Sequence, residues 1–217
     1  EIKASVLKRA MKKTREKSLV NFFKSSKYIE ASYEDDKYNL LDKYNEKGYR
    51  DAMILSDSVV QVSPKRVKIY INVEEGKKYY YNNITWVGNT VYDSERLSRI
   101  LNIQKGDVYN KKYFNERLND DENTAVNKLY VNNGYLFFRA IPVETVVGND
   151  SINVEIRIFE GPQATINRVI IKGNDRTHEH VARRELYVYP GELFSREDVM
   201  RSYRAVSYTH SEPTRRV

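Results

Sequence analysis

Few side chains in this sequence have the types and spacing that metal binding or catalysis needs. His178 and His180 form an H-x-H pair, and such a pair on a strand can bind a metal ion because imidazole nitrogens are good zinc ligands. These histidines fall where a helix is expected to begin, and no cysteine or acidic constellation accompanies them. We therefore expect no metal site at this pair.

An acidic triplet, Asp120-Asp121-Glu122, is the second candidate. Calcium-binding loops place acidic residues at alternating positions around a glycine. The triplet has neither the alternation nor the glycine, so we interpret it as the solvent-exposed face of a helix.

Several other kinds of catalytic or binding site are excluded because the sequence lacks the residues or motifs that they require. It contains no cysteine, which excludes disulfides, thiolate metal sites and cysteine nucleophiles. It also contains no glycine-rich phosphate loop and no nucleophile elbow. We therefore expect no catalytic residues, no cofactor and no metal, and we predict that the protein is not an enzyme.

The charge is positive but unevenly spread. The 217 residues include 37 basic and 30 acidic side chains, a net charge of +7, and seven basic against two acidic residues lie in the first twenty positions. We interpret this basic stretch as an exposed helix face, with an anionic membrane surface or a nucleic acid as alternatives. The 18 tyrosines could stack on bases, which keeps a basic nucleic-acid-binding repeat protein as an alternative. Many of them fall at helix ends and strand flanks, which favours packing, and we expect no nucleic-acid partner.

Membrane and targeting segments are not evident in the sequence. No apolar run approaches the roughly 18 residues of a membrane-spanning helix, and no signal peptide is recognised. The first residues already follow a helical pattern, so we expect the chain to be a piece of a longer protein.

One stretch of the sequence occurs twice. Glu75 to Asn89 and Glu160 to Asn174 each run from an acid-Gly pair through an apolar strand pattern to Gly-Asn, and the two copies lie 85 residues apart. Gly106-Asp107-Val108-Tyr109 recurs at the same offset as Gly191-Glu192-Leu193-Phe194, and Gly48-Tyr49 recurs 86 residues later as Gly134-Tyr135. A fixed period of this kind indicates an array of small, similar domains.

The repeat sets the predicted domains. We expect a first domain over residues 1–76 that lacks its first strand, a complete domain over 77–161, the start of a third over 162–204, and an atypical tail over 205–217 that we interpret as an artefact or scar. Glycines at the same points of each repeat suggest turns that need positive φ. The predicted turn glycines are Gly48, Gly76, Gly88, Gly106, Gly134, Gly161, Gly173 and Gly191.

The complete domain is predicted to have the element order β-α-α-β-β. Its predicted elements are strand 79–87, helix 94–101 with a cap at Asp93 or Ser94, a long helix 110–132, and strands 136–147 and 151–159. The first domain shows helices at 2–13 and 33–47 and strands at 51–62 and 67–73. The third shows a strand around Val169 and Ile171, a helix at 179–186 and the start of another at Ser195, with the pattern failing after about Arg204. The predicted fold class is thus α+β: tandem domains, each a three-stranded mixed sheet with two helices on one face.

This topology leaves one strand of each sheet on an edge. The last two strands form a hairpin, and the first strand can join the third because the two helices supply the crossover. The strand that is second in sequence then exposes unpaired backbone groups, which can accept another extended chain. Two segments qualify, 52–60 and 136–145, but Pro142 removes a donor from the latter. The predicted peptide-binding edge is therefore Ala52, Met53, Ile54, Leu55, Ser56, Asp57, Ser58, Val59 and Val60.

With these landmarks the repeated unit resembles the polypeptide-transport-associated (POTRA) domain. The resemblance rests on Gly-Tyr after the second helix, Glu-Gly at the end of the third strand and Gly-Asn after the first strand. The arrangement is similar to the third, fourth and part of the fifth domains in the periplasmic arm of BamA-type outer-membrane β-barrel assembly factors. The Tyr- and Lys-rich composition suggests a Bacteroidetes-type source.

The resemblance implies a scaffold without catalytic residues on the periplasmic side of the outer membrane of a Gram-negative bacterium. Family members bind unfolded outer-membrane proteins, partly by strand addition, together with lipoproteins of the assembly complex. They reach the outer-membrane surface through a C-terminal barrel, which this chain lacks. The arm of a related polypeptide-translocating outer-membrane transporter is the alternative within this class.

Overall fold

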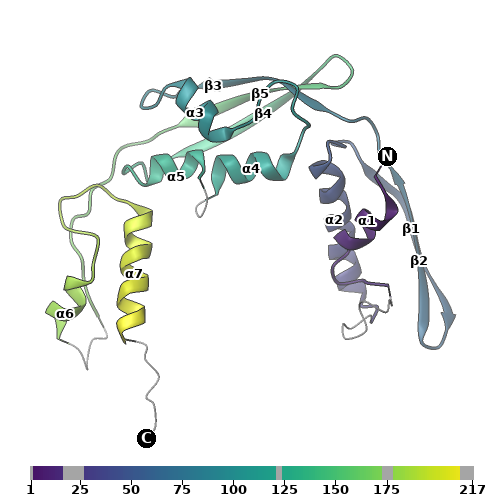
Figure 1. Cartoon of the computed structure of the whole chain (residues 1–217), viewed down its shortest axis with the longest axis horizontal. Helices are drawn as coiled ribbons and strands as arrows, with labels where there is room; N and C mark the ends of the chain where they lie inside the picture. Colours follow the sequence, from purple (N-terminus) through teal and green to yellow (C-terminus); the bar gives the residue numbers. More distant parts are fainter. Residues whose placement is uncertain (1, 17–26, 121–123, 173–177, 211–217) are drawn as a thin grey trace, which may run out of the picture. The chain divides into compact units, whose positions relative to one another are not determined.

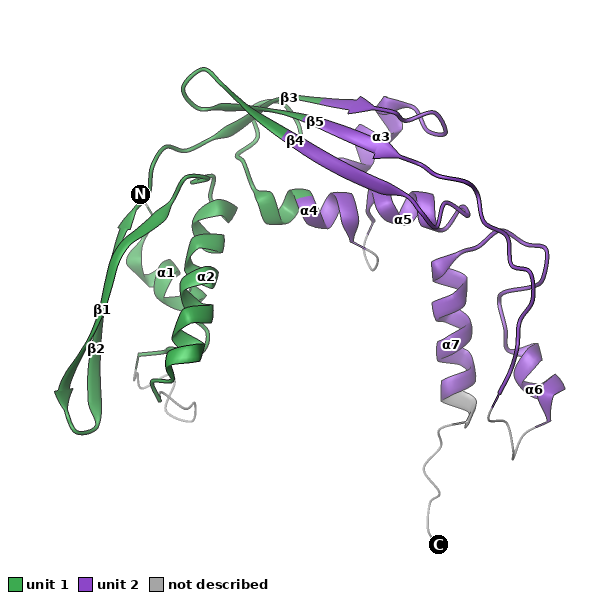
Figure 2. Cartoon of the chain, turned by 180° about the vertical axis from the view of Figure 1, so that it is seen from behind, with its two compact units in different colours: residues 1–84, 103–114, 144–154 green, residues 85–102, 115–143, 155–217 purple. Residues whose placement is uncertain are grey.

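The computed structural model describes residues 2–16, 27–120, 124–172 and 178–210. The chain divides into two compact units, one comprising residues 1–84, 103–114 and 144–154, the other residues 85–102, 115–143 and 155–217 (Figure 2). The element order over these residues begins with two helices and a hairpin and ends with two helices (Figure 1).

The first repeat contains α1 (Ala4–Ala10), α2 (Glu30–Glu46), β1 (Met53–Ser63) and β2 (Arg66–Glu74). β1 and β2 pair antiparallel as a two-stranded sheet, as the alternation of apolar and polar residues over 67–73 predicted. Asp36 on α2 is fully buried and accepts hydrogen bonds from the backbone amides of Lys13 and Thr14. This carboxylate therefore ties the segment after α1 to α2, a contact that no sequence pattern indicated.

The second repeat contains β3 (Tyr80–Val87), α3 (Ser94–Leu101), α4 (Lys111–Asn119), α5 (Val126–Val131), β4 (Arg139–Val147) and β5 (Ser151–Phe159). Its sheet has the order β3-β5-β4, so β5 lies in the middle. The inward residues of β5 are accordingly buried: Ile152, Val154, Ile156 and Ile158. The prediction that the first strand joins the third and leaves the second on an edge is confirmed. The N-terminus of α3 is capped by the Asp93 side chain, which accepts from the Arg96 amide at 2.7 Å.

One predicted helix is wrong in this repeat. We expected a single helix over residues 110–132, whereas α4 ends at Asn119 and α5 begins at Val126, with Ala125 in an extended conformation. The intervening sequence is rich in Asn, Asp and Thr, whose side chains compete for backbone hydrogen bonds and disfavour a helix interior. Of the acidic triplet, Asp120 follows the end of α4, and Asp121 and Glu122 lie outside the described residues.

The third repeat contains α6 (Glu179–Arg184) and α7 (Arg196–His210). Two expectations fail here. The segment around Val169 and Ile171 is not a strand, and only Thr165 forms an isolated bridge, with Leu193. A strand needs a partner for its backbone groups, and the described residues contain no strand after β5 that could supply one. The helix also does not stop near Arg204 but continues to His210, because no glycine or proline interrupts residues 196–210.

Seven of the eight predicted turn glycines have φ between 68° and 95°, and Gly173 lies outside the described residues. Gly88 illustrates why such a turn needs glycine. A Cβ built there would lie 2.5 Å from the carbonyl oxygen of Ile158, so both the positive φ and the close backbone approach demand glycine.

Candidate strand-binding edge

The predicted binding edge falls on β1, which has only β2 as a neighbour among the described strands. Figure 1 shows the two strands as a long hairpin, with β2 on one side of β1. The strand begins at Met53 and continues to Ser63, so Ala52 precedes it and the strand extends beyond the predicted Val60. One long side of β1 therefore carries backbone groups that no described strand pairs.

The register of the hairpin assigns each β1 side chain to a face, because directly opposite residues share a face. Asp57 lies opposite Ile71 and Val59 opposite Ile69. Ser58 lies opposite Tyr70 and Val60 opposite Lys68, on the other face. On one face of the hairpin the β2 residues opposite β1 are thus apolar, and on the other face they are polar. An amphipathic strand added at the β1 edge would continue this difference between the two faces.

Irregularities in the pairing limit the usable length of this edge. The register shifts between Ile54 and Ser56, which leaves Leu55 as an extra residue, and again between Gln61 and Ser63. Bulges bend an edge strand and interrupt further pairing. The regular portion is therefore Ser56 to Gln61. It lies largely within the predicted segment.

Asp57 has a structural role within the edge. Its carboxylate lies 3.4 Å from the Lys37 ammonium on α2, and Lys37 also contacts Glu34 at 2.9 Å. The hydrogen bond to the Glu34 carboxylate is the largest influence and raises the pKa of Lys37; burial opposes it, and the Asp57 carboxylate adds to the increase. Burial, together with the Asp57 carboxylate, raises the pKa of Tyr33. The ion pair with Lys37 thus links Asp57 of β1 to α2.

The corresponding edge of the second repeat differs. β4 contains Pro142 within the strand, and proline removes one backbone donor and is tolerated on sheet edges for that reason. β4 also contributes Glu144, which accepts from the Tyr109 hydroxyl at 2.9 Å and pairs with Arg50 at 3.1 Å. β4 is thus partly committed to structural contacts.

Repeated glycines also join one repeat to the next within each compact unit. In the first unit the Tyr79 amide donates to the Gly48 carbonyl at 2.8 Å, and the Tyr79 hydroxyl donates to Asp51 at 2.6 Å. In the second unit the Ala164 amide donates to the Gly134 carbonyl at 2.7 Å. The Gly-Tyr landmarks were predicted as turns, but no sequence pattern indicated that they bond to the following repeat.

The residues considered for metal chemistry are not part of this edge. His178 and His180 stack with their rings 5.6 Å apart. Within the described ranges, no group of three or more His, Cys, Asp or Glu side chains is placed to hold a metal ion. Over the same part of the chain, no helix is both long enough and apolar enough to span a membrane.

Comparisons with known proteins agree with this architecture. The family model described as "POTRA: Surface antigen variable number repeat" matches residues 1–76, 79–161 and 164–208. The crystal structure of Haemophilus influenzae BamA POTRA3-5 superposes with a TM-score of 0.71 at 20% identity, covering 99% of this chain and 83% of that chain.

Two curated relatives are also similar in sequence. A Treponema pallidum (strain Nichols) protein that carries the description of an outer membrane protein assembly factor is 28% identical over 206 residues, covering 92% of this chain and 24% of the relative. Outer membrane protein assembly factor BamA of Neisseria meningitidis serogroup B is 25% identical over 152 residues, covering 67% of this chain and 19% of the relative. The chain thus spans about a quarter or less of the length of these relatives. With almost the whole sequence matched in three consecutive stretches, the chain belongs to the POTRA family.

Proposed function

We propose that this chain is part of the periplasmic arm of a BamA-type outer-membrane protein assembly factor, and that its β1 edge receives extended segments of unfolded outer-membrane proteins. The proposal is supported by the similarity to proteins named as assembly factors and by the unpaired side of β1. The similarity to assembly factors favours this role over that of a transporter arm.

The observation that carries the proposal is the regular stretch of β1 from Ser56 to Gln61, between the two register shifts. A six-residue edge can bind an incoming strand through main-chain hydrogen bonds, which make little demand on its sequence. Its two faces differ in polarity, so an incoming strand with alternating apolar and polar residues would extend both faces. Strands of membrane β-barrels have this alternation.

The same role implies further partners. We propose that lipoproteins of the assembly complex bind the array, and that the arm works next to the outer-membrane surface. An array of small domains offers extended surface to several partners at once.

The test uses the absence of native cysteine. A Ser58→Cys variant of the 217-residue chain is mixed, in the presence of oxidised glutathione as the oxidant, with a ten-residue peptide of alternating apolar and polar residues that carries one central cysteine. Opposite Cβ atoms of paired neighbouring strands lie about 4.5–5.5 Å apart. Small movements of the two strands bring such a pair to the distance that a disulfide requires. The proposal predicts that the mixed disulfide accumulates with this variant.

The matched control is Thr145→Cys on β4, the edge strand that contains Pro142. We expect at least several-fold less cross-linking there than at Ser58→Cys. Equal cross-linking at both positions, or none at Ser58→Cys, would contradict the proposed edge.

A further inference from the structure

The sheet of the second repeat carries exposed apolar side chains on the face that points away from its buried core. Ile158 of β5 is buried, whereas Phe159, the next residue, is 51% exposed, because successive side chains of a strand point to opposite faces. The Arg139 guanidinium of β4 lies over the Phe159 ring, 5.9 Å from its centroid, so Arg139 shares that face. Ile141 follows Arg139 by two residues on β4, lies on the same face and is 48% exposed.

Phe137 extends this apolar surface just before β4 begins. It is 61% exposed and lies beside Gly161, where a built Cβ would be 3.2 Å from the Phe137 Cβ. With about 150–250 Å² of surface per aromatic side chain, the exposed parts of the two phenylalanines amount to roughly 170–280 Å². Apolar patches of this order on a folded protein are often functional. The outer-face patch is defined by four residues of the second compact unit (Figure 2): Phe137, Arg139, Ile141 and Phe159.

The first repeat shows that the fold does not require these apolar side chains. β2 and β5 correspond over their whole length at an offset of 85 residues. Asp51 lies beside Gly76 in the same way that Phe137 lies beside Gly161. At the equivalent positions the first repeat has polar or charged side chains: Glu74 for Phe159, Ser56 for Ile141 and Asp51 for Phe137. The apolar residues of the second repeat are therefore not a requirement of the architecture.

The outer-face patch is also not a junction between consecutive repeats. On the equivalent face of the first repeat, three residues are exposed although a complete repeat follows: Met53, Ser56 and Glu74. The counterpart of Phe137, Asp51, does accept a hydrogen bond from the Tyr79 hydroxyl. At the next junction Ala164 stands in the place of Tyr79, 85 residues later, and Phe137 is left exposed.

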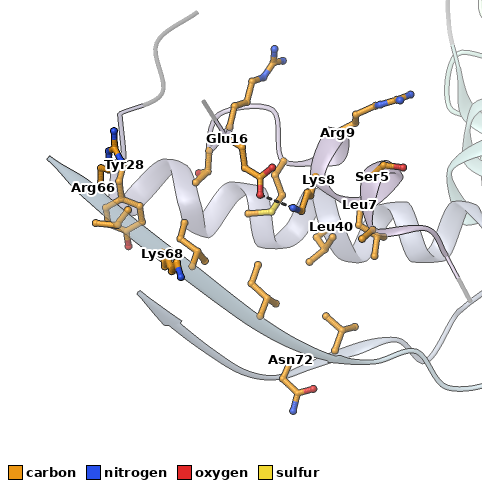
Figure 3. Close-up of a pocket in the computed structure, with 18 of the residues that line it drawn as sticks. Ser5, Leu7, Lys8, Arg9, Glu16, Tyr28, Leu40, Arg66, Lys68 and Asn72 are labelled. Carbon is orange, nitrogen blue, oxygen red and sulfur yellow. Dashed lines mark hydrogen bonds and ion pairs between the residues drawn. The ribbon is translucent and has the colours of Figure 1, made fainter. Parts of the chain in front are cut away.

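A groove in the first repeat differs from this patch in its origin. It is lined by α1, α2 and β2, and Figure 3 shows Leu7 and Leu40 on its helical side. β2 corresponds to β5, which is paired with β3 in the second repeat, so the groove is the place of the first strand of a complete repeat. The outer-face patch, in contrast, lies on a sheet that has all three of its strands.

Arg139 gives the outer-face patch its charge. Within the described part of the chain no carboxylate pairs with Arg139, whereas Arg157, on the same strand as Phe159, pairs with Glu155 at 2.7 Å. A guanidinium can bind a carboxylate through two parallel hydrogen bonds. Arginine and aromatic residues are also enriched in the cores of protein interfaces. This combination favours a protein partner that presents an acidic side chain next to apolar ones.

We propose that the outer-face patch binds a segment of a partner protein in which apolar side chains flank an Asp or Glu. The apolar side chains pack on Phe137, Ile141 and Phe159, and the carboxylate pairs with Arg139. The segment contacts side chains on the face of the sheet and leaves the backbone groups of β4 unpaired. It is thus distinct from strand addition at β1 and does not depend on the function proposed for that edge.

The probe is a ten-residue peptide with Phe-Asp-Leu at its centre and Gly or Ser elsewhere, titrated into the isotope-labelled 217-residue chain. We expect the amide NMR signals of residues 137–141 and 157–161 to shift, and those of residues 56–61 to stay in place. A peptide with Lys in place of Asp should bind at least about fivefold more weakly at low salt, and this difference should shrink as salt is added. A peptide with Gly in place of Phe and Leu should lose binding to a similar extent.

Two variants introduce the residues of the first repeat, which the same architecture accommodates. Phe159→Glu and Ile141→Ser should each weaken binding of the Asp peptide at least about fivefold. Arg139→Glu should reverse the preference, so that the Lys peptide binds more tightly than the Asp peptide. Tyr203→Glu is the matched control, because Tyr203 on α7 is an aromatic residue that is 65% exposed, and we expect it to leave binding unchanged.

Native-like NMR spectra of each variant confirm that it is folded. Equal binding of the Asp and Lys peptides, shifts confined to β1, or full binding by the folded Phe159→Glu variant would overturn the proposal. Dimers of the chain that Phe159→Glu abolishes, without binding of any peptide, would also overturn it and would assign the outer-face patch to self-association.

Discussion

The Glu160 carboxylate accepts a hydrogen bond from the Tyr130 hydroxyl at 2.9 Å. The same carboxylate accepts from the Thr90 and Val91 amides at 2.9 and 3.0 Å, and from the Thr90 hydroxyl. Glu160 stands in the repeated Glu-Gly landmark, and Thr90 follows the repeated Gly-Asn. Two landmarks of the repeat are therefore joined by one side chain, which closes the end of β5 onto the loop after β3 and onto α5.

Replacing Glu160 should destabilise the second repeat. Glu160→Ala removes the carboxylate that accepts from the Tyr130 hydroxyl, and losing hydrogen bonds to a charged, half-buried group costs about 1.5–3 kcal/mol. Chemical denaturation should show this loss in the free energy of unfolding. Glu155→Gln is the control, because the pair that Glu155 forms with Arg157 is exposed, and we expect a change within about 0.5 kcal/mol. Equal effects of the two changes would contradict the role assigned to Glu160.

The contribution of Glu160 should depend on pH. Burial alone would raise the pKa of this carboxyl, but the hydrogen bonds from Thr90, Val91 and Tyr130 outweigh it and hold the pKa below its ordinary value of 4.5. A carboxyl with a lowered folded-state pKa stabilises the fold above the unfolded pKa, and this contribution is lost as pH falls through the folded pKa.

The difference in the free energy of unfolding between the wild type and Glu160→Gln should therefore be constant near neutral pH and shrink below about pH 4.5. Denaturation series at pH 7, 5, 4 and 3 would measure it. A difference that grows on acidification would contradict the predicted direction of the Glu160 pKa shift.

Substituting two glycines that have nearly the same φ distinguishes the energetic cost of positive φ from the cost of a steric clash. Gly88 has φ 87° and a built Cβ meets the Ile158 oxygen at 2.5 Å, whereas Gly106 has φ 92° and nothing within 4 Å. Gly106→Ala should cost about 1–2 kcal/mol from positive φ alone. Gly88→Ala should cost at least about 1 kcal/mol more, because the backbone of β5 must shift. Thermal unfolding of both variants checks this order, and a smaller loss for Gly88→Ala would refute it.

Arg50 and Glu144 should be energetically coupled across the junction within the first unit. Their side chains are 32% and 26% exposed and 3.1 Å apart, so the pair is partly shielded from water. A double-mutant cycle with Arg50→Ala and Glu144→Ala should give a coupling energy of about 0.5–1 kcal/mol. Arg99 and Glu95, which are 72% and 85% exposed and 3.9 Å apart, provide a control pair with little expected coupling. Equal coupling in both cycles would contradict a special role for the junction.

Much of the fold could be predicted because its landmarks repeat. The alternation in β2 and β5, the cap at Asp93 and the sheet order followed from local pattern and topology rules. The resemblance to POTRA domains is confirmed by the family match. These features depend on contacts between residues close in sequence or on rules of chain connection, which a single sequence reveals.

The failures involve contacts that local patterns do not encode. The break between α4 and α5 lies in a polar stretch. The apolar residues on both sides of it keep helical spacing, so the pattern predicted one continuous helix. The segment around Val169 alternates like a strand, but the described residues there form only an isolated bridge, that of Thr165 with Leu193. The bulge at Leu55 and the buried Asp36 depend on how distant segments fit together. The residues predicted for the binding edge do form a strand, β1, but the limits of that strand and its bulges could not be set from the sequence.

The most direct test of the proposed function is an NMR measurement of the isotope-labelled chain with the unlabelled amphipathic peptide. Backbone nuclear Overhauser effects between the peptide and residues 56–61 report strand pairing at that edge and nowhere else. We expect a ladder of such contacts over the regular part of β1, ending near Leu55 and Val62, where the register shifts. A bound peptide whose contacts lie only on β4, or on no strand at all, would contradict it.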